Sequence, residues 1–410
     1  MADWKAKWFP RIVAVFPALF PLYLFRASWF GVPVTMVEMA LFVLIILFVF
    51  TEKIWSPKWW FQNASHWKLW PVGIFLLAAL ISTFIVQSPL EWIDGSVFES
   101  QTRAIGILKG WVLAPLAYFA IARHTFSEKP SYVSIALDAM LVGGAGLALL
   151  AINQEISGEF LTADGRASGP FESANYLSLY LGPLVVYGVL QSLEGRYWDF
   201  RRSIRLVLTF LVTVGLYFTE SYAAWLGVAA AIGLWAVFSF NKLPKKWRSI
   251  LLMGFVTSIV VLFLSQLGTD KLLQFFEFSE RSSSSVRLEV YEISLSLIAQ
   301  NPFFGLGLGQ FEWFYQTEAV NILGHAPFEW VMLHSHNIFL AMWLNVGLLG
   351  LAAFIWMCSK ALAWLFENDK KGRSVAAFML VALLVHGLFD TPYFKNDLAF
   401  QFWLLMAILL

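Results

Sequence analysis

Two histidines beside a long apolar run have the chemistry needed to move a proton. They lie in the segment His334-Ser335-His336-Asn337, just before residues 338–364 become apolar. An imidazole titrates near neutral pH, so it can accept a proton from a hydroxyl group. At a boundary between membrane and water, such a pair can titrate and still reach a substrate carried by a lipid. We consider His336 a candidate base and expect His334 and Asn337 to contact substrate, with anchoring at the interface as the alternative role of the histidines.

A second set of residues could bind an anion. Arg287 begins an expected helix over residues 286–300, where backbone N–H groups and a guanidinium together favour negative charge. Arg166 stands shortly before another apolar run. Guanidinium groups bind phosphate oxygens through paired hydrogen bonds and keep their charge, so two of them at one site would suit a pyrophosphate. The alternative role of these arginines is pairing with the nearby Glu172 or Glu289.

A third polar group lies near the C-terminus, in residues 386–397. This short segment contains two carboxylates, Asp390 and Asp397, together with Lys395. We expect Asp390 and Lys395 to contact substrate. Ion pairing within the segment is the alternative role of all three side chains.

The composition indicates a membrane protein. Of the 410 residues, 59% are hydrophobic and only 13% are charged, with a mean hydropathy of +0.68, whereas soluble domains carry about 25% charged residues. A water-soluble protein of this composition could not cover its core, which excludes a soluble enzyme. The net charge of +1 leaves no basic face for nucleic acid. The single cysteine, Cys358, excludes a disulfide framework and a cysteine metal cluster.

The elements that position these residues are expected to be transmembrane helices. A helix crosses the membrane with about 20 apolar residues, and about twelve segments fit this length. They are residues 10–25, 32–50, 71–87, 105–122, 132–152, 176–193, 204–220, 223–240, 250–267, 337–364, 375–389 and 398–410. Glu38 and Asp138 fall inside these spans, where an unpaired carboxylate costs about 2–3 kcal/mol.

The distribution of basic residues predicts the orientation. Lys and Arg concentrate in the loops on the side of the N-terminus, which places both termini in the cytoplasm. The histidine, arginine and C-terminal polar segments then face outward. The chain is expected to form one integral membrane domain over residues 1–410.

A large outer loop over residues 268–336 separates the ninth and tenth spans. It starts with a serine run between Arg281 and Arg287 and continues through the expected helix to Asn301-Pro302 and a glycine run. Aromatic segments at 311–315 and 328–330 suggest a surface in the membrane interface. Long loops are often functional, so we expect this one to cover the site and to guide a lipid-borne substrate.

These motifs resemble the bacterial O-antigen ligase and polymerase superfamily. The resemblance covers about residues 160–400 and rests on four stretches. They are His336-Asn337 followed after nine residues by Gly347 and Gly350, Arg287…Asn301-Pro302…Gly305-x-Gly307, Gly169-x-Phe171…Asn175, and Asp390…Lys395-Asn396-Asp397-Leu398. The first four spans resemble the family only in hydropathy.

The resemblance implies roles for individual residues. His336 would be the catalytic base and Arg287 a pyrophosphate ligand, with Asn175 among the binding residues. Relatives often carry Thr-x-Ser-Arg after the seventh span, where this chain has Thr219-Glu220-Ser221-Tyr222. Tyr222 therefore occupies a binding position in place of an arginine. The residues available to compensate for that missing cation are Arg166, Arg281, Lys109 and Lys395.

Together, these observations predict an all-α polytopic membrane protein of the GT-C-like type that acts as an inverting glycosyltransferase independent of metal and of cofactors. The donor would be a glycan on polyprenyl pyrophosphate, at the outer face of the bacterial cytoplasmic membrane and among its lipids. Three acceptors stay open: lipid A-core for a ligase, a lipid-linked repeat for a polymerase, or a protein hydroxyl for an O-oligosaccharyltransferase. The alternative from another class is a multi-span secondary transporter or flippase, which would place its charged groups near the membrane midplane.

Overall fold

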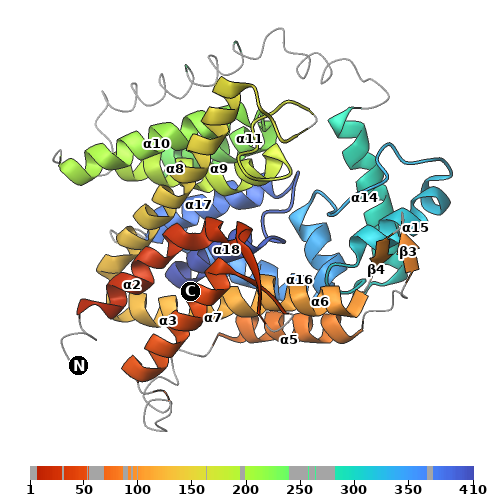
Figure 1. The fold of residues 1–410 in the computed structure, drawn as a ribbon, viewed down its shortest axis with the longest axis horizontal. Helices are drawn as coiled ribbons and strands as arrows, with labels where there is room; N and C mark the ends of the chain where they lie inside the picture. Colours follow the sequence, from red (N-terminus) through yellow and green to blue (C-terminus); the bar gives the residue numbers. More distant parts are fainter. Residues whose placement is uncertain are drawn as a thin grey trace.

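The computed structural model in Figure 1 is mostly helical, with two short hairpins as its strands. It describes residues 7–29, 32–52, 54, 69–85, 91–93, 96–98, 100–162, 164–193, 199–239, 257, 264, 282–366 and 373–410.

The first half of the chain alternates helices with hairpins. Its elements are α2 (Phe9–Val15), η1 (Phe16–Leu24), β1 (Arg26–Trp29), β2 (Val32–Thr35), α3 (Met36–Glu52), α5 (Trp70–Phe84), β3 (Glu91–Ile93), β4 (Ser96–Phe98), α6 (Ser100–Ile107), the π-helical η2 (Leu108–Leu113), α7 (Ala114–Glu128), η3 (Pro130–Tyr132) and α8 (Val133–Ser157). Both hairpins are antiparallel, with Arg26 paired to Thr35 in one and Glu91 paired to Phe98 in the other.

The second half contributes most of the segments that meet at the candidate site. Its elements are α9 (Ala174–Leu193), α10 (Phe200–Phe218), α11 (Tyr222–Ser239), α14 (Ser283–Gln300), α15 (Phe311–Leu323), α16 (Ile338–Leu362), η5 (Ala363–Leu365), α17 (Arg373–His386) and α18 (Asn396–Leu409). Figure 1 shows α14 and α15 as a group beside the main bundle, next to β3 and β4.

The described helices support a multi-pass membrane protein. Five are long and apolar enough to cross a membrane: Thr102–Glu128, Pro130–Ser157, Ala174–Leu193, Tyr222–Ser239 and Ile338–Leu365. Shorter apolar helices cover Phe9–Leu24, Trp70–Phe84, Arg373–His386 and Asn396–Leu409. A mostly helical structure with membrane-spanning helices is thus supported, whereas the number of twelve spans and the placement of the loop stay predictions. Most of the expected span 250–267 lies outside the described residues.

One predicted span begins too early. The segment 32–50 was expected to be helical throughout, but residues 32–35 form strand β2 and the helix begins at Met36. Residues 32–35 pair with Arg26–Trp29, so their backbone groups are satisfied across a hairpin. Pro33 has no N–H to donate, which suits an edge strand.

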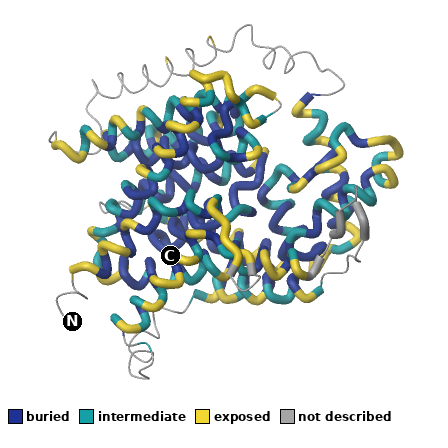
Figure 2. The backbone as a smooth tube through the Cα atoms, in the orientation of Figure 1, coloured by how far each residue is buried: buried dark blue, intermediate teal, exposed yellow. Residues whose placement is uncertain are grey.

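The centre of the bundle is α18. Every residue from Asp397 to Leu409 in this helix is buried, and the helix packs against α7, α17 and η1. Figure 2 shows buried backbone through the middle of the bundle and exposed segments around it. A helix that is apolar on all sides is stable only when other helices surround it. The last helix of the chain therefore holds the others together.

The two acids inside expected spans are both paired. Asp138 in α8 accepts hydrogen bonds from Arg205 Nε at 2.8 Å and Nη2 at 3.0 Å and from the Tyr187 hydroxyl at 2.6 Å. Glu38 lies 3.2 Å from Lys109 Nζ. Paired in this way, neither carboxylate carries the cost of an isolated charge in an apolar environment.

The described part of the large loop, residues 282–336, contains two helices rather than one. The expected helix 286–300 is confirmed but begins at Ser283, because Ser282 and Ser285 form a reciprocal capping box before it. The second helix, α15, was not predicted. It buries Phe311 and Tyr315 in a small core with α14, so these rings of the segment 311–315 do not form an exposed surface. Residues 268–281 lie outside the described residues.

The glycine motifs join this loop to α16. Helix α16 is interrupted at Gly347, which has φ of 70° and ψ of −178°. At the break, Leu306 N–H donates to Leu344 O at 2.7 Å and Leu348 N–H donates to Phe303 O at 3.0 Å. A Cβ at Gly347 would collide with the backbone of residues 303–304. The glycine therefore permits backbone-to-backbone docking that fixes the loop relative to the helix behind His336.

Candidate active site

A cavity of about 1000 Å³ lies between α9, α11 and α14, and half of the ten candidate residues line it. It is lined by Asp164, Arg166, Asn175, Glu220, Ser221, Tyr222, Ala223, Leu226, Ser282, Ser283, Ser284, Arg287, Leu288, Tyr291, Phe389 and Asp390. Five of the predicted site residues are among them. The lining comes from five chain segments, so the cavity exists only in the folded protein.

One side of the cavity, the anion wall, consists of Arg166, Asn175, Arg287 and the first turn of α14. Arg166 Nε is 2.6 Å from Asp164 Oδ2, and its Nη1 is 3.4 Å from both Asn175 Oδ1 and Thr219 O. Burial by itself would raise the pKa of Asp164, but the charge and hydrogen bonds of Arg166 outweigh it and lower that pKa. Asp164, rather than the expected Glu172, is thus the acid that pairs with Arg166.

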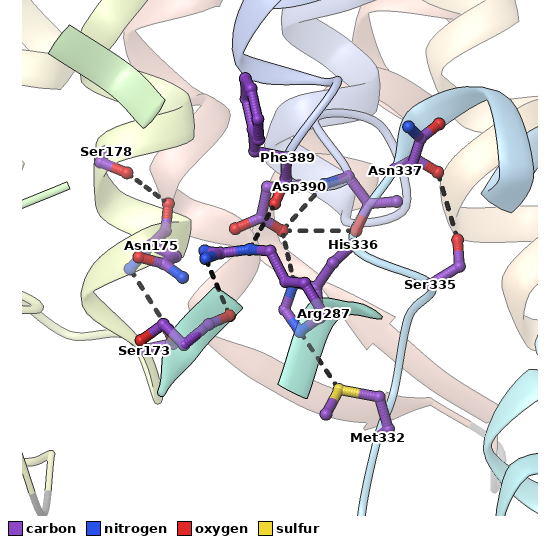
Figure 3. Close-up of polar contacts among 12 residues, drawn as sticks. Ser173, Asn175, Ser178, Arg287, Met332, Ser335, His336, Asn337, Phe389 and Asp390 are labelled. Atoms are coloured by element: carbon purple, nitrogen blue, oxygen red, sulfur yellow. Dashed lines mark hydrogen bonds and ion pairs between the residues drawn. The ribbon is translucent and has the colours of Figure 1, made fainter. Parts of the chain in front are cut away.

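Arg287 projects from the first turns of α14 across the cavity. Its Nε donates to Phe389 O and its Nη1 to Ser283 O, both at 3.2 Å. Figure 3 shows the guanidinium passing Asp390 and directed toward the side of Asn175. Glu289, the partner in the alternative role of Arg287, instead accepts the Phe328 N–H at 2.9 Å. The Arg287 guanidinium therefore binds carbonyl oxygens, and Glu289 does not neutralise its charge.

The N-terminus of α14 adds backbone donors to the same wall. Ser282 caps the helix, and Ser283 and Ser284, the first residues of the helix, line the cavity. The leading N–H groups of a helix lack intrahelical partners and carry a partial positive charge. Together with Arg287 they make a site suited to phosphate oxygens.

The opposite side, the base wall, consists of Asp390, which lines the cavity, and His336, which contacts Asp390 without lining the cavity itself. His336 Nδ1 is 3.5 Å from Asp390 Oδ1, and its Nε2 is 3.1 Å from Met332 Sδ. The Tyr291 hydroxyl donates to His336 O at 2.9 Å and lies 3.0 Å from Leu388 O. Figure 3 shows the imidazole between Asp390 and Met332. One ring nitrogen thus faces a carboxylate and the other faces a soft sulfur atom that a hydroxyl group could displace.

The backbone at His336 is strained. Its φ is +48°, and the other described non-glycine residue with a positive φ is Glu220, which lines the cavity. Left-handed conformations of ordinary residues cost of order 1–3 kcal/mol and persist only where the surroundings impose them. Both of these conformations therefore occur at this site, where the fold maintains them.

Asp390 is nearly inaccessible, with 3% of its surface exposed. Burial would raise its pKa, but the contact with His336, the charges of His336 and His386, and the Thr391 N–H at 2.8 Å bring that pKa well below its usual range. The carboxylate is therefore ionised at neutral pH. An ionised carboxylate against Nδ1 orients an imidazole and stabilises it once Nε2 has taken a proton.

Asn337 supports the base wall and does not reach the cavity. Its Oδ1 caps α16 by accepting from Phe339 N at 2.9 Å and Leu340 N at 3.2 Å, and its Nδ2 donates to Leu388 O at 3.1 Å. The amide is thus occupied by the protein, and the expected contact of Asn337 with substrate stays a prediction. Its position ties His336 to the loop that carries Asp390.

Other candidates lie beside the cavity. His334 packs against the rings of Trp111 and Tyr176, at centroid distances of 6.4 and 6.1 Å. Burial lowers the pKa of His334 to about 4, so this imidazole is neutral at neutral pH. Lys395 is held over aromatic rings, with Nζ 3.8 Å from the Tyr176 centroid. Lys109 pairs with Glu38, and neither lysine lines the cavity.

Tyr222 lines the cavity from the first turn of α11, whereas Arg281 lies outside the described residues. Sequence reasoning missed Tyr291, Met332, Asp164 and Glu220. Tyr291 could have been found, because it follows Arg287 by four residues on the expected helix and so shares its face. Met332 could not, since nothing in its type or spacing indicates contact with His336.

A metal site does not emerge from the described residues: no group of three or more His, Cys, Asp or Glu side chains is arranged to hold a metal ion. The geometry instead brings two cationic side chains and a helix N-terminus to one wall of the cavity, and an imidazole–carboxylate pair to the other. Arg287 links the walls, because it bonds the carbonyl of Phe389 beside Asp390. Arg287 and Asp390 line the same cavity, and His336 contacts Asp390, so the predicted convergence of imidazole and guanidinium on one substrate stays a prediction.

Comparison with known proteins agrees with this arrangement. A family model described as O-antigen ligase matches residues 207–355, which include Tyr222, Arg287 and His336. The chain is 23% identical to the O-antigen ligase of Salmonella typhimurium (strain LT2) over 368 residues, covering 86% of this chain and 82% of that protein. Both matches confirm the resemblance to the O-antigen ligase and polymerase superfamily that the motifs indicated.

Proposed function

We propose that this protein transfers a glycan from polyprenyl pyrophosphate to an acceptor hydroxyl at the outer face of a bacterial cytoplasmic membrane. The observation that carries this proposal is the cavity itself, whose lining combines Arg166 and Arg287 with Asp390, the carboxylate that contacts His336. Relationship to O-antigen ligases supports a membrane enzyme that transfers glycans. A leaving pyrophosphate needs the cationic donors of the anion wall, and an attacking hydroxyl needs the base of the base wall.

The anion wall would hold the donor. The pyrophosphate would lie between Arg287, the first turn of α14 and Arg166, with Asn175 fixing Arg166. These groups stabilise negative charge as the bond between the anomeric carbon and the phosphate oxygen breaks. Because fixed cations and N–H dipoles supply this charge stabilisation, a divalent metal is not required, and we expect full transfer in the presence of a chelator.

The base wall would activate the acceptor. His336 Nε2 takes the proton of the acceptor hydroxyl, while the hydroxyl oxygen forms its bond to the anomeric carbon and polyprenyl pyrophosphate leaves. Asp390 stabilises the resulting imidazolium across the 3.5 Å contact to Nδ1. Since Nε2 faces Met332 Sδ, the acceptor hydroxyl would replace the thioether at this nitrogen. One displacement at the anomeric carbon inverts its configuration.

The charges at the two ends of α8 support the proposed orientation. Near its beginning, Asp138 binds Arg201 and Arg205, while its end leads to the loop that carries Arg166. Basic residues favour the cytoplasmic side. The cavity would then open outward, opposite this arginine cluster, and both termini would be cytoplasmic.

Among the acceptors, lipid A-core is favoured by the full-length relative, which is named an O-antigen ligase. A polymerase would instead use a second lipid-linked repeat, and an O-oligosaccharyltransferase would use a protein hydroxyl. The experiment that separates them is transfer by the purified protein in proteoliposomes from one polyprenyl-pyrophosphate glycan, with each acceptor offered alone and a chelator present.

The decisive variant is His336→Ala, matched by His325→Ala in the same loop, where the histidine is exposed. We expect wild type and His325→Ala to transfer glycan, and His336→Ala to lose about 10²- to 10⁴-fold in kcat because the base is gone. A secondary transporter or flippase would move the lipid-linked glycan across the bilayer without transfer, and His336→Ala would leave that movement unchanged. That result would overturn the proposed function.

A further inference from the structure

Lys395 occupies an unusual environment beside the base wall. Its ammonium lies over three aromatic rings, with Nζ 3.8 Å from the Tyr176 centroid, 4.0 Å from that of Phe171 and 5.7 Å from that of Tyr23. Among the described residues it donates no hydrogen bond and has no carboxylate within 4.0 Å. The rings therefore provide the contacts that hold this charge.

The cage joins one segment from each wall of the cavity, and Tyr23 of η1 supplies the third ring. Phe171 and Tyr176 belong to the loop and first turn of α9 that carry Arg166 and Asn175. Lys395 ends the short loop that begins beyond α17 and carries Asp390. A cation clamped over these rings thus fixes the spacing between the anion wall and the carboxylate that orients His336.

The rest of the Asp390 loop is anchored elsewhere. Asn337 and Tyr291 bind Leu388 O, and Arg287 binds Phe389 O. The Tyr393 hydroxyl donates to Trp111 O at 2.9 Å. These contacts join the loop to α14, α16 and η2, while Lys395 joins it to α9.

We infer that Lys395 is a positioning residue for glycan transfer, whose caged ammonium aligns Asp390 and His336 with the donor held by Arg166 and Asn175. This inference rests on the proposed function. It assigns Lys395 a role other than the substrate contact expected from the sequence. Because a displacement of about 1 Å can cost about 10²-fold in rate, loss of the cage should reduce kcat more than it weakens donor binding.

The charge of Lys395 is sensitive to alkaline pH. Burial lowers the pKa of Lys395 to about 8, and its neighbours modify that effect in both directions. The titratable and charged side chains around it are Tyr23, Arg26, Glu172, Tyr176, His334 and Asp397. Asp397, the carboxylate nearest in sequence, favours the charged ammonium. Above pH 8 the amine loses its charge and with it the attraction to the ring faces.

Two substitutions separate charge from bulk. Lys395→Met keeps the length and removes the charge, whereas Lys395→Arg keeps a charge that does not titrate. The matched control is Lys360, whose Nζ lies 5.4 Å from the Trp356 centroid on the exposed surface of α16. We expect Lys395→Met to lose about tenfold to 100-fold in kcat with little change in donor KM, and the Lys360→Met variant to match wild type.

The pH profile supplies a readout that a merely structural role would not move. Wild-type kcat should fall above pH 8, and Lys395→Arg should retain most of its activity without that fall. An Lys395→Met variant with wild-type kcat, or an Lys395→Arg variant with the wild-type alkaline fall, would overturn the inference.

A second measurement keeps this inference separate from the proposed function. Backbone hydrogen exchange of residues 387–395 should become faster in Lys395→Met and stay at the wild-type rate in Lys395→Arg and Lys360→Met. If the wild type transfers no glycan to any acceptor, the proposed function fails. The exchange rates still test whether the caged Lys395 holds the Asp390 loop. Unchanged exchange in Lys395→Met would show that the cage does not hold the Asp390 loop.

Discussion

The two walls of the cavity are built in different ways. On the base wall, His336 has a strained backbone and one carboxylate partner, and Asp390 is almost fully buried. On the anion wall, two arginines and a helix N-terminus offer several donors to one region, and both guanidinium groups are partly exposed. The base wall therefore depends on the alignment of one pair, His336 and Asp390. The anion wall instead sums the contributions of several donors to anion binding.

This difference suggests why the chain can have a tyrosine at position 222, where relatives often have arginine. Several donors can share the charge of an anion, so the loss of one donor weakens anion binding only in part. A base has no such substitute, because proton transfer needs one atom at hydrogen-bond distance. The comparison predicts severe effects on the base wall and graded effects on the anion wall.

The largest contrast should come from two carboxylates. Asp390→Asn removes the charge that orients His336, and we expect kcat to fall about 10²-fold or more. Its matched control is Asp164→Asn, which removes the partner of Arg166 and should change donor KM by only a few-fold. Steady-state transfer kinetics measure both parameters. Equal losses of kcat in the two variants would contradict the division into two walls.

An intermediate effect is expected from the arginines. Arg287→Gln and Arg166→Gln should each raise donor KM about tenfold, since each removes one charge-assisted contact to phosphate. The double variant should lose roughly the product of the two effects, and binding of inorganic pyrophosphate should weaken in parallel. A variant that loses kcat while it binds pyrophosphate as wild type does would place its arginine on the base wall instead.

The smallest effect should follow from restoring the family cation. Tyr222→Arg adds a guanidinium to the cavity, so we expect donor KM to decrease by about two- to fivefold with kcat nearly unchanged. Tyr222→Phe is the control for the loss of the hydroxyl. A large gain in kcat from Tyr222→Arg would mean that the anion wall of the native chain, rather than its base, limits turnover.

Much of the helical framework follows from local composition. Each expected span, except 250–267 outside the described residues, coincides with a described helix over most of its length. The error at residues 32–35 has a local cause, because a four-residue strand and an apolar helix end have similar hydropathy. Helix α15 was missed because its aromatic residues indicated a surface, while their spacing of four residues placed Phe311 and Tyr315 on one buried face.

The candidate site was predictable as a set of residues and not as a set of contacts. The types and motifs indicated His336, Arg287, Arg166 and Asp390. Which acid would pair with which cation did not follow, since Asp164 rather than Glu172 pairs with Arg166, and Glu289 binds a loop N–H. Asp164 lies nearer to Arg166 in sequence than Glu172 does, whereas Glu289 lies two residues from Arg287 and still binds elsewhere, so distance in sequence alone does not decide the partner.

The sequence by itself determined that the chain is a helical membrane protein with polar segments at one set of helix ends. Hydrophobic transfer depends on the composition of each segment, so it can be read without knowing where that segment lies. Only the tertiary structure decided that Lys395 enters an aromatic cage and that Asp390 faces His336. Contacts of that kind depend on the packing of helices distant in sequence, and no local pattern encodes the distance between them.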